Sequence, residues 1–342
     1  MILLFCALFY LTTTNKKLSI ASSRKFIGNE GKLKLFFEKL TIILGKDNIF
    51  ENEMMNKHTT FQLGGPAKFF IRPKSINKII KVILLCKEYS IDYFILGNGS
   101  NLLVSDKGYK GLVININEDN FSDLKVEQLD KINYKIKVGA GMLMTNLAKK
   151  LCLLSLSGLE DIIDIPGTIG GGIIMNATSG SEKGLISNSL DNVKVITPEG
   201  EYKELSKEEC KLRIKGSYLK DNKYMVIEAT FNLIKGDKMI IQKKMATLTS
   251  ARYSSQPRYF PNAGCFFVWF GPIFGSLYQK YKENNLVGYK VGDAMIYPKN
   301  IAFIVNLGNA TSSEVYEIVI SIENTMKSKY NINIILLLII FS

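Results

Sequence analysis

The sequence predicts an α+β fold divided into several domains. Its 342 residues are enough for two or three domains. A strand–helix–strand pattern over residues 69–96 predicts a small α/β unit, and alternating strand-like segments at 112–116 and 134–138 predict a further sheet. A helical segment at 237–253 then separates these strands from a third group of elements.

Apolar spacing and turn residues define the elements of the first unit. Gly45 is placed to end its first helix, and Ser75 is placed to cap its second. In chain order, the unit contains a helix at 34–44, a strand at 69–73, a helix at 76–88 and strands at 93–96 and 102–104.

The later elements follow from the same patterns. Thr311 or Ser312 would cap the last helix. Beyond the two strands at 112–138, we expect a helix at 142–154, strands at 193–197 and 224–233, the linking helix at 237–253, a helix around Leu277, a strand at 302–306, a helix at 313–330 and a buried strand at 334–341.

A tight turn, here called the first glycine loop, interrupts the apolar run that starts at Tyr93. Gly97 and Gly99 can adopt positive φ and leave no Cβ in the way, so backbone N–H groups can converge on one point. Such a nest suits an anionic oxygen, most often of a phosphate, although an ordinary hairpin turn is an alternative. No third glycine opens a helix, so this is not the dinucleotide fingerprint. The candidate binding residues are Gly97, Asn98, Gly99, Ser100 and Asn101.

The second glycine loop lies between Asp164 and Asn176. Backbone this bare lets a ligand lie directly against the main chain. Two phosphate-sized nests about 70 residues apart suggest one pyrophosphate held from two sides. The candidate binding residues here are Pro166, Gly167, Thr168, Gly170 and Gly171.

With both loops in place, the chain resembles the UDP-N-acetylenolpyruvoylglucosamine reductase (MurB) family from about Lys34 to the C-terminus. Several ordered blocks with unusual glycines are far more specific than any single motif. The matching blocks are Lys57–Ala67, Gly97–Val104, Asp164–Asn176, Gln256–Pro257, Pro261–Phe267, Gly288–Ala294 and Phe303–Asn306.

The resemblance implies a three-domain α+β flavoenzyme. Its two-part FAD-binding region, of the PCMH or vanillyl-alcohol-oxidase type, would occupy 33–105 and 106–236, and a C-terminal α/β substrate domain would occupy 237–342. Residues 1–32 would be an extension outside the family. Its apolar start is too short to span a bilayer and lacks a positive n-region. We expect it to be upstream sequence from a wrong start codon; a degenerate signal and a small anchor are alternatives.

The resemblance also implies the reaction. NADPH reduces non-covalently bound FAD, and the enolpyruvyl ether of UDP-N-acetylglucosamine then accepts the hydride and becomes UDP-N-acetylmuramate, a peptidoglycan precursor. The enolate formed on the way needs a stabilised negative charge and a proton. FAD is expected to place its pyrophosphate between the two glycine loops, with Thr60 and Gly64 nearby.

The family's catalytic positions differ in this chain. Lys215 stands where the family has arginine, and it lacks the bidentate fork, although Arg213 could compensate if both lie on one strand. Cys265 stands at the proton donor, and its thiol can donate a proton; the alternative is a small buried cysteine. Leu337 stands at the glutamate, where no proton chemistry is possible. Lys215 and Cys265 are the catalytic candidates.

Departures from the family pattern cluster in the substrate half, whereas the flavin loops are nearly intact, so several functions stay open. One is a working reductase, in which losing one charge-stabilising group costs on the order of 10²- to 10³-fold in rate. Another is a flavin-binding homologue with lost or weakened activity. A third is a different flavin oxidoreductase, against which the intact blocks at 256–257 and 303–306 argue.

The composition fits a cytoplasmic enzyme that binds anionic ligands. The net charge of +13 suits dinucleotides and a UDP-sugar, but the lysines are spread evenly, with no nucleic-acid signature. Five cysteines without a C-x-x-C pair indicate a reducing compartment. The single histidine, His58, argues against a histidine-bearing metal cluster and is expected to be a loop residue near the cofactor rather than a covalent flavin attachment. No stable membrane association is expected.

Overall fold

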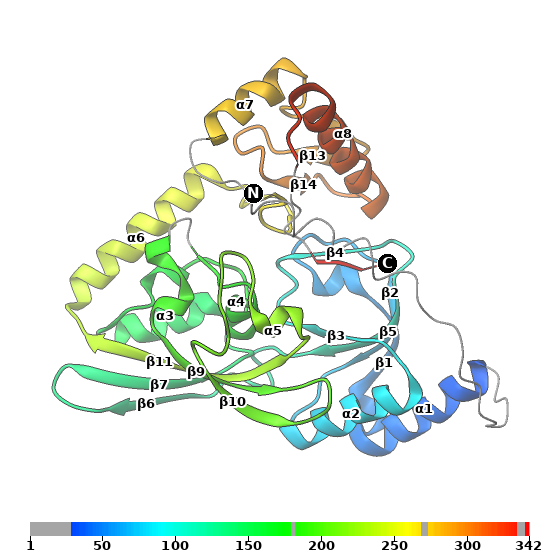
Figure 1. Ribbon diagram of the computed structural model, residues 1–342, viewed down its shortest axis with the longest axis vertical. Coiled ribbons are helices and arrows are strands. Elements are labelled where there is room, and N and C mark those ends of the chain that lie inside the picture. Colours follow the sequence, from blue (N-terminus) through cyan, green and yellow to red (C-terminus); the bar gives the residue numbers. More distant parts are fainter. Residues whose placement is uncertain (1–28, 179–181, 268–272, 334–338, 342) are drawn as a thin grey trace.

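The computed structural model describes residues 29–178, 182–267, 273–333 and 339–341. Figure 1 shows two sheet-containing units side by side and a third, smaller unit stacked above them. Short 3₁₀ turns join several elements, at Lys46–Asn48, Met55–His58, Glu160–Ile162, Glu182–Gly184 and Ile186–Asn188.

The first unit is a four-stranded mixed sheet covered by two helices. In spatial order its strands are β1 (Ile49–Met54), β2 (Pro66–Ile71), β5 (Tyr109–Asn115) and β3 (Tyr93–Leu96). The β1–β2 pair is antiparallel, whereas β5 runs parallel to both β2 and β3. Alternate side chains such as Phe69 and Ile71 pack against the helices α1 (Asn29–Leu44) and α2 (Ile76–Tyr89), and Ser75 caps α2 as predicted.

The second unit is an antiparallel sheet with short helices on one face (Figure 1). Its strands, in spatial order, are β10 (Tyr202–Ser206), β9 (Leu190–Ile196), β11 (Met225–Lys235), β7 (Asn133–Gly139) and β6 (Leu124–Gln128), with β8 (Leu156–Ser157) added to β11. The helices are α3 (Met144–Leu153), α4 (Ile169–Ile174) and α5 (Tyr218–Asp221). One continuous hydrophobic core joins this unit to the helices of the first.

The third unit follows the long helix α6 (Lys238–Ser255). It contains α7 (Ile273–Glu283), the three-stranded sheet of β12 (Lys290–Val291), β13 (Ala294–Ile296) and β14 (Ile304–Asn306), and α8 (Ser312–Tyr330). Thr311 caps α8 through a capping box with Glu314. The chain then returns to the first unit, where β15 (Ile339–Phe341) pairs in parallel with β4 (Leu102–Val104).

The third unit is held tightly against the first. The Asp106 carboxylate accepts hydrogen bonds from the N–H groups of Ser312 (2.9 Å) and Ser313 (3.2 Å) at the start of α8. Phe61, Leu63 and Leu103, which belong to the N-terminal part of the chain, are buried in the hydrophobic core of the third unit. The core of the third unit is therefore completed by residues from the first.

Most predicted elements are confirmed, and three of the missed strands share a cause. The edge strands β1, β6 and β10 expose most of their side chains, so they lack the apolar alternation that predicts a strand. The second glycine loop is not a loop throughout, because its glycines continue into the helix α4. For the predicted strand at 334–341, residues 334–338 lie outside the described residues.

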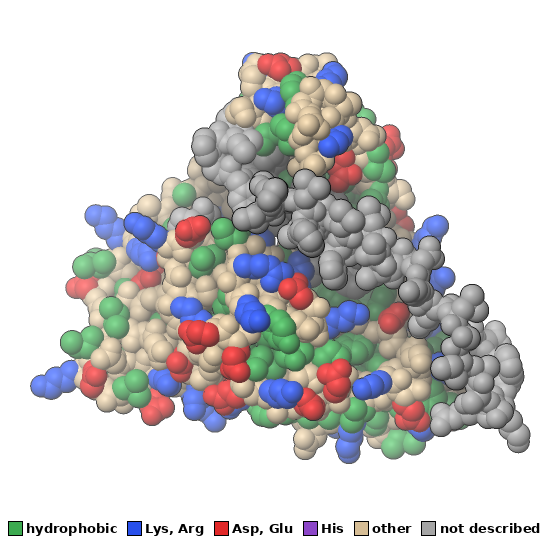
Figure 2. All heavy atoms as spheres, in the orientation of Figure 1, with side chains coloured by type: hydrophobic (Ala, Val, Ile, Leu, Met, Phe, Trp, Pro, Cys, Tyr) green, Lys and Arg blue, Asp and Glu red, His purple; other side chains and the backbone are tan. Residues whose placement is uncertain are grey.

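Two expectations concern the surface. Figure 2 shows basic and acidic side chains intermixed over the face in view, in keeping with positive charge that is spread rather than gathered. In the part of the chain that the structure describes, no helix has both the length and the apolar content needed to cross a bilayer.

Candidate active site

A cleft of about 1550 Å³ lies where the three units meet. Single-ligand pockets usually measure about 300–1000 Å³, so this cleft has room for a large cofactor together with a second molecule. Its walls come from β3 and the first glycine loop, the second glycine loop, the segment after Arg213, the end of α6, and residues 256–267 of the third unit. All the predicted site residues line it except Thr60 and Gly64.

The two glycine loops touch each other inside the cleft. The side-chain amide of Asn98 donates a 2.6 Å hydrogen bond to the carbonyl oxygen of Pro166. A Cβ added to Gly97 would lie only 2.5 Å from Thr168 Oγ1, so the two loops can approach this closely only because residue 97 has no side chain. The first loop is not a hairpin turn, because the strand before it pairs with β5 and the strand after it pairs with β15.

The first glycine loop presents unpaired backbone donors. The N–H groups of Asn98, Gly99 and Ser100 have no hydrogen-bond acceptor among the described residues. Gly99 has φ +62°, and a side chain at this position would collide with the carbonyl oxygen of His58. Consecutive amides that a positive-φ glycine turns toward one point form an anion nest, so this loop suits a phosphate oxygen.

The second glycine loop is fixed by the cap of α4. Thr168 Oγ1 accepts a hydrogen bond from the N–H of Gly171 (3.3 Å). Gly170 packs closely on Ala140, whereas a Cβ on Gly171 would meet only Thr168 Oγ1, at 3.5 Å. Gly171 is exposed on the cleft wall, so its missing side chain leaves room there. The open backbone on both walls fits the diphosphate of a dinucleotide.

Thr60 and Gly64 support this arrangement from behind. Thr60 donates its N–H to the carbonyl of Gly99 (3.2 Å) and its hydroxyl to the carbonyl of Asn262 (2.7 Å), which ties the first glycine loop to the third unit. Gly64 is buried with φ +123°, and a Cβ there would lie 2.7 Å from that of Val104. A glycine is therefore required at position 64, because any side chain there would clash with Val104.

His58 does not line the cleft. Its Nε2 lies 2.9 Å from Glu53 Oε1, and its ring stacks on Phe70 at 4.2 Å between ring centroids. Only its backbone carbonyl approaches the first glycine loop, at Gly99. The ring is therefore engaged away from the cleft, with Glu53 and Phe70.

The two catalytic candidates face the same cleft. Burial raises the pKa of the Cys265 thiol, while the positive charges of Lys215 and Arg252 act in the opposite direction. Lys215 lies in a tight turn with φ +61°, which backbone hydrogen bonds between Arg213 and Gly216 close. A thiol and two cations on the walls of one cleft can supply a proton and positive charge to an anionic ligand.

The suggestion that Arg213 compensates for Lys215 is wrong. Residues 213–216 form a turn rather than a strand, so the two side chains do not share a face. The Arg213 guanidinium pairs with Asp221 at 2.8 Å on the protein surface and does not line the cleft.

Arg252 is the cleft residue that sequence reasoning missed. It lies near the end of α6 and is only 8% exposed. Its neighbours along α6 are mostly exposed, so no apolar pattern marks the face that the helix turns toward the cleft. The matching Gln256-Pro257 block, four residues further on, was the nearest signal. Leu337, the position of the family's glutamate, lies outside the described residues.

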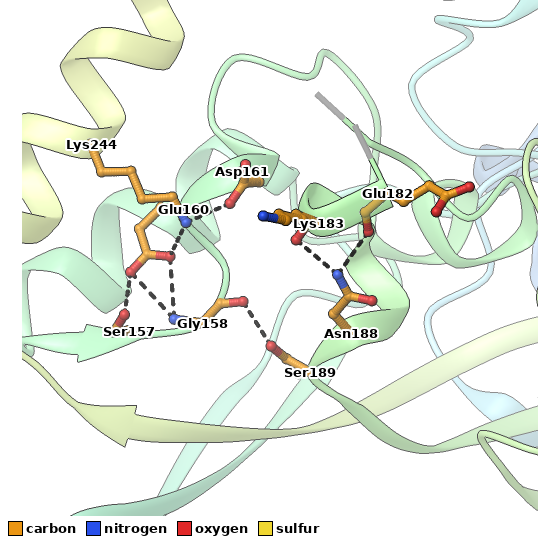
Figure 3. Close-up of polar contacts among 9 residues, drawn as sticks. All are labelled: Ser157, Gly158, Glu160, Asp161, Glu182, Lys183, Asn188, Ser189 and Lys244. Atoms are coloured by element: carbon orange, nitrogen blue, oxygen red, sulfur yellow. Dashed lines mark hydrogen bonds and ion pairs between the residues drawn. The ribbon is translucent and has the colours of Figure 1, made fainter. Parts of the chain in front are cut away.

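A polar cluster fixes the segment that precedes the second glycine loop (Figure 3). The buried carboxylate of Glu160 accepts hydrogen bonds from Ser157 Oγ (2.5 Å) and Lys244 Nζ (3.1 Å), and Lys244 also pairs with Asp161 at 2.6 Å. Burial acts to raise the pKa of Glu160, but these hydrogen bonds and the Lys244 charge outweigh it and hold the pKa below its usual range. The cluster thus locks α6 to the loop segment.

Comparison with known proteins gives consistent matches along the chain. Residues 67–206 match a family model described as an FAD binding domain, and residues 256–336 match the C-terminal domain of UDP-N-acetylenolpyruvoylglucosamine reductase. The reductase of Lachnoclostridium phytofermentans is 35% identical over 300 residues, which is 88% of this chain and 95% of that protein. The reductase of Clostridium novyi is 36% identical over 297 residues, 87% of this chain and 93% of that protein.

A solved structure has the same fold. The crystal structure of UDP-N-acetylenolpyruvylglucosamine reductase (MurB) from Thermus caldophilus superposes with a TM-score of 0.69 and 29% sequence identity. The match covers 85% of this chain and 98% of that one, so it spans all three units.

Proposed function

The chain belongs to the UDP-N-acetylenolpyruvoylglucosamine reductase family, and from that premise we propose that the cleft between its three units is the active site of such a reductase. The protein is an FAD-dependent oxidoreductase that uses NADPH to reduce UDP-N-acetylglucosamine enolpyruvate to UDP-N-acetylmuramate in peptidoglycan precursor synthesis. The observation that carries the site assignment is the direct contact between the two glycine loops in one cleft with Cys265.

The FAD site would lie along both glycine loops. The unpaired amides of Asn98, Gly99 and Ser100 would donate to the diphosphate, and Asn101 and the residues around Thr168 would complete the cradle. When bound, FAD relays a hydride from NADPH to the vinyl carbon of the substrate. We assign 33–105 and 106–236 to FAD binding and 237–342 to the substrate domain, with 1–32 as an extension.

The protein's own contribution is charge and a proton. The Cys265 thiol would donate the proton to the substrate carbon, and the Lys215 ammonium would stabilise the negative charge that precedes this transfer. The cytoplasm is the proposed location, because every cysteine in the described part of the chain is a free thiol.

The test separates the two half-reactions. Purified protein with bound FAD should bleach on anaerobic addition of NADPH, and the yellow colour should return when the enolpyruvyl substrate is added. Flavin that stays reduced after substrate is added would show a flavin-binding homologue that has lost the reductase activity. Reoxidation by oxygen alone, without need for the enolpyruvyl ether, would show a different oxidoreductase.

A further inference from the structure

The cleft contains a buried cation, Arg252, that has no role in the proposed reaction so far. Arg252 lines the cleft wall and is 8% exposed, and its Nε has no hydrogen-bond partner among the described residues. Among the described residues, the Arg252 side chain donates one hydrogen bond, from Nη1 to Gln256 Oε1, at 3.3 Å. A buried guanidinium N–H without an acceptor costs free energy, so this group is suited to donate a hydrogen bond to a bound ligand.

The nearest carboxylate does not satisfy this cation. The Asp164 carboxylate accepts a 2.5 Å hydrogen bond from Thr249 Oγ1 and lies 3.7 Å from the Arg258 guanidinium. Its negative charge acts on Arg252 without forming an ion pair with it. Arg252 forms no ion pair with any carboxylate of the described residues. Its positive charge is therefore available to an anion that enters the cleft.

Arg252 lies where an anionic intermediate would form. Arg252, Lys215 and Cys265 all line this cleft, and the charges of both cations act on the Cys265 thiol. Arg252 extends from a long helix that Lys244 and Thr249 fix to the loop segment, whereas Lys215 extends from a tight turn. Only the guanidinium offers the planar fork that matches a carboxylate with two parallel hydrogen bonds.

We propose that Arg252 binds the carboxylate of the enolpyruvyl substrate and stabilises the enolate, which deepens the proposed function and rests on it. Hydride addition to the terminal vinyl carbon moves the π-electron pair onto the α-carbon and its carboxylate. Arg252 holds that charge until the Cys265 thiol gives its proton to the α-carbon and becomes a thiolate. NADPH supplies the two electrons of the reduction.

The experiment measures the two half-reactions separately in Arg252→Met, Arg252→Lys and the control Lys243→Met. Lys243 is an exposed cation on the same helix, away from the cleft. In Arg252→Met, flavin reduction by NADPH should stay within about twofold of wild type, and reoxidation by the enolpyruvyl substrate should slow about 10²- to 10³-fold. Arg252→Lys should recover part of this loss, and Lys243→Met should match wild type in both steps.

A binding readout distinguishes substrate contact from a structural effect. Titration of the oxidised holoenzyme with UDP-N-acetylmuramate, followed by the flavin absorbance spectrum, should show at least tenfold weaker binding in Arg252→Met with unchanged FAD retention. If Arg252→Met does not fold, Arg252→Lys must still bind this product more weakly than Lys243→Met.

Each contrary result has a distinct meaning. Wild-type reoxidation and product binding in the Arg252 variants would overturn this inference and leave the proposed function intact. An equal slowing of both half-reactions would place Arg252 against the flavin and also overturn it. Wild-type flavin that the enolpyruvyl substrate cannot reoxidise would overturn the proposed function, and this inference with it.

Discussion

The side-chain amide of Asn98 donates a 2.6 Å hydrogen bond to the carbonyl of Pro166, and this bond joins two loops that are 68 residues apart in the sequence. We predict that Asn98→Ala weakens FAD binding about two- to tenfold, because a net hydrogen bond is worth about 0.5–1.5 kcal/mol. The dissociation constant of FAD, measured by the recovery of flavin fluorescence on release, checks this.

Asn324→Ala is the matched control, because Asn324 is an exposed asparagine on α8 that does not line the cleft. It should leave FAD affinity unchanged. An Asn98→Ala variant that holds FAD as tightly as the control would show that the contact between the loops does not shape the cofactor site.

Two glycine substitutions should separate loop packing from cofactor contact. Gly97→Ala places a methyl group 2.5 Å from Thr168 Oγ1, so the loops must move apart, with an expected cost of about 1–3 kcal/mol in the stability of the apoprotein. Gly171→Ala places its methyl group at 3.5 Å from the same atom and lies within α4, so the apoprotein should be as stable as wild type or more so.

Both variants should lose FAD affinity, for different reasons. In Gly171→Ala the new methyl group occupies cleft space that the cofactor would use. Thermal unfolding of the apoproteins and FAD titration of each provide the comparison. Full FAD affinity in Gly171→Ala would remove the second glycine loop from the proposed cofactor site.

Replacement of Cys265 tests its role as proton donor. Cys265→Ala should slow flavin reoxidation by the enolpyruvyl substrate about 10²- to 10⁴-fold, while Cys152→Ala, which removes a buried thiol away from the cleft, should not. The donor must be protonated, and burial raises the pKa of this thiol, so wild-type reoxidation should fall only above the ordinary cysteine pKa of about 8.5.

Cys265→Ser sharpens this test. A serine hydroxyl does not titrate in this range, so the alkaline fall should disappear from the pH profile of the oxidative step. An identical alkaline fall in the serine variant would mean that another group limits the rate.

The buried Glu160 makes stability depend on acid pH. Its folded-state pKa lies below the ordinary value of about 4.3, so its contribution to stability is present above that pH and is lost as the pH falls through the folded-state pKa. Glu160→Gln should lower the free energy of unfolding at pH 7 by about 1–3 kcal/mol, because the charge-assisted hydrogen bonds of the buried carboxylate to Ser157 and Lys244 are weakened, although Lys244 keeps Asp161 as a partner.

Urea unfolding as a function of pH measures this contribution, with the exposed Glu127→Gln as control. The stability curves of wild type and Glu160→Gln should converge at acid pH, because protonation removes the same charge that the substitution removes. Parallel curves down to pH 3 would contradict the assignment.

The sequence revealed the parts of the site that depend on local backbone chemistry. Glycines such as Gly97 and Gly99 have a conformational meaning that can be interpreted without knowing what lies beside them, so both loops that line the cleft and form the proposed cofactor site could be singled out. The strand–helix–strand order of the first unit followed in the same way, from apolar spacing and the Ser75 cap.

The missed features depend on contacts between distant segments. Whether Arg252 turns toward the cleft or toward water is decided by how α6 docks, and its own neighbours along the helix do not show this. Side chains two residues apart, such as those of Arg213 and Lys215, lie on the same face only if the segment is an extended strand. Residues 213–216 form a turn instead, so these two side chains do not share a face. The pairing of β4 with β15 joins opposite ends of the chain, and no local pattern specifies it.

The burial of Phe61, Leu63 and Leu103 in the core of the third unit has a practical consequence for dissecting this protein. A fragment that ends before α6 would expose these three side chains to water, and an isolated C-terminal fragment would have a gap in its interior. Chimeras that exchange the substrate-binding half between relatives must therefore also transplant the N-terminal segment that completes its core.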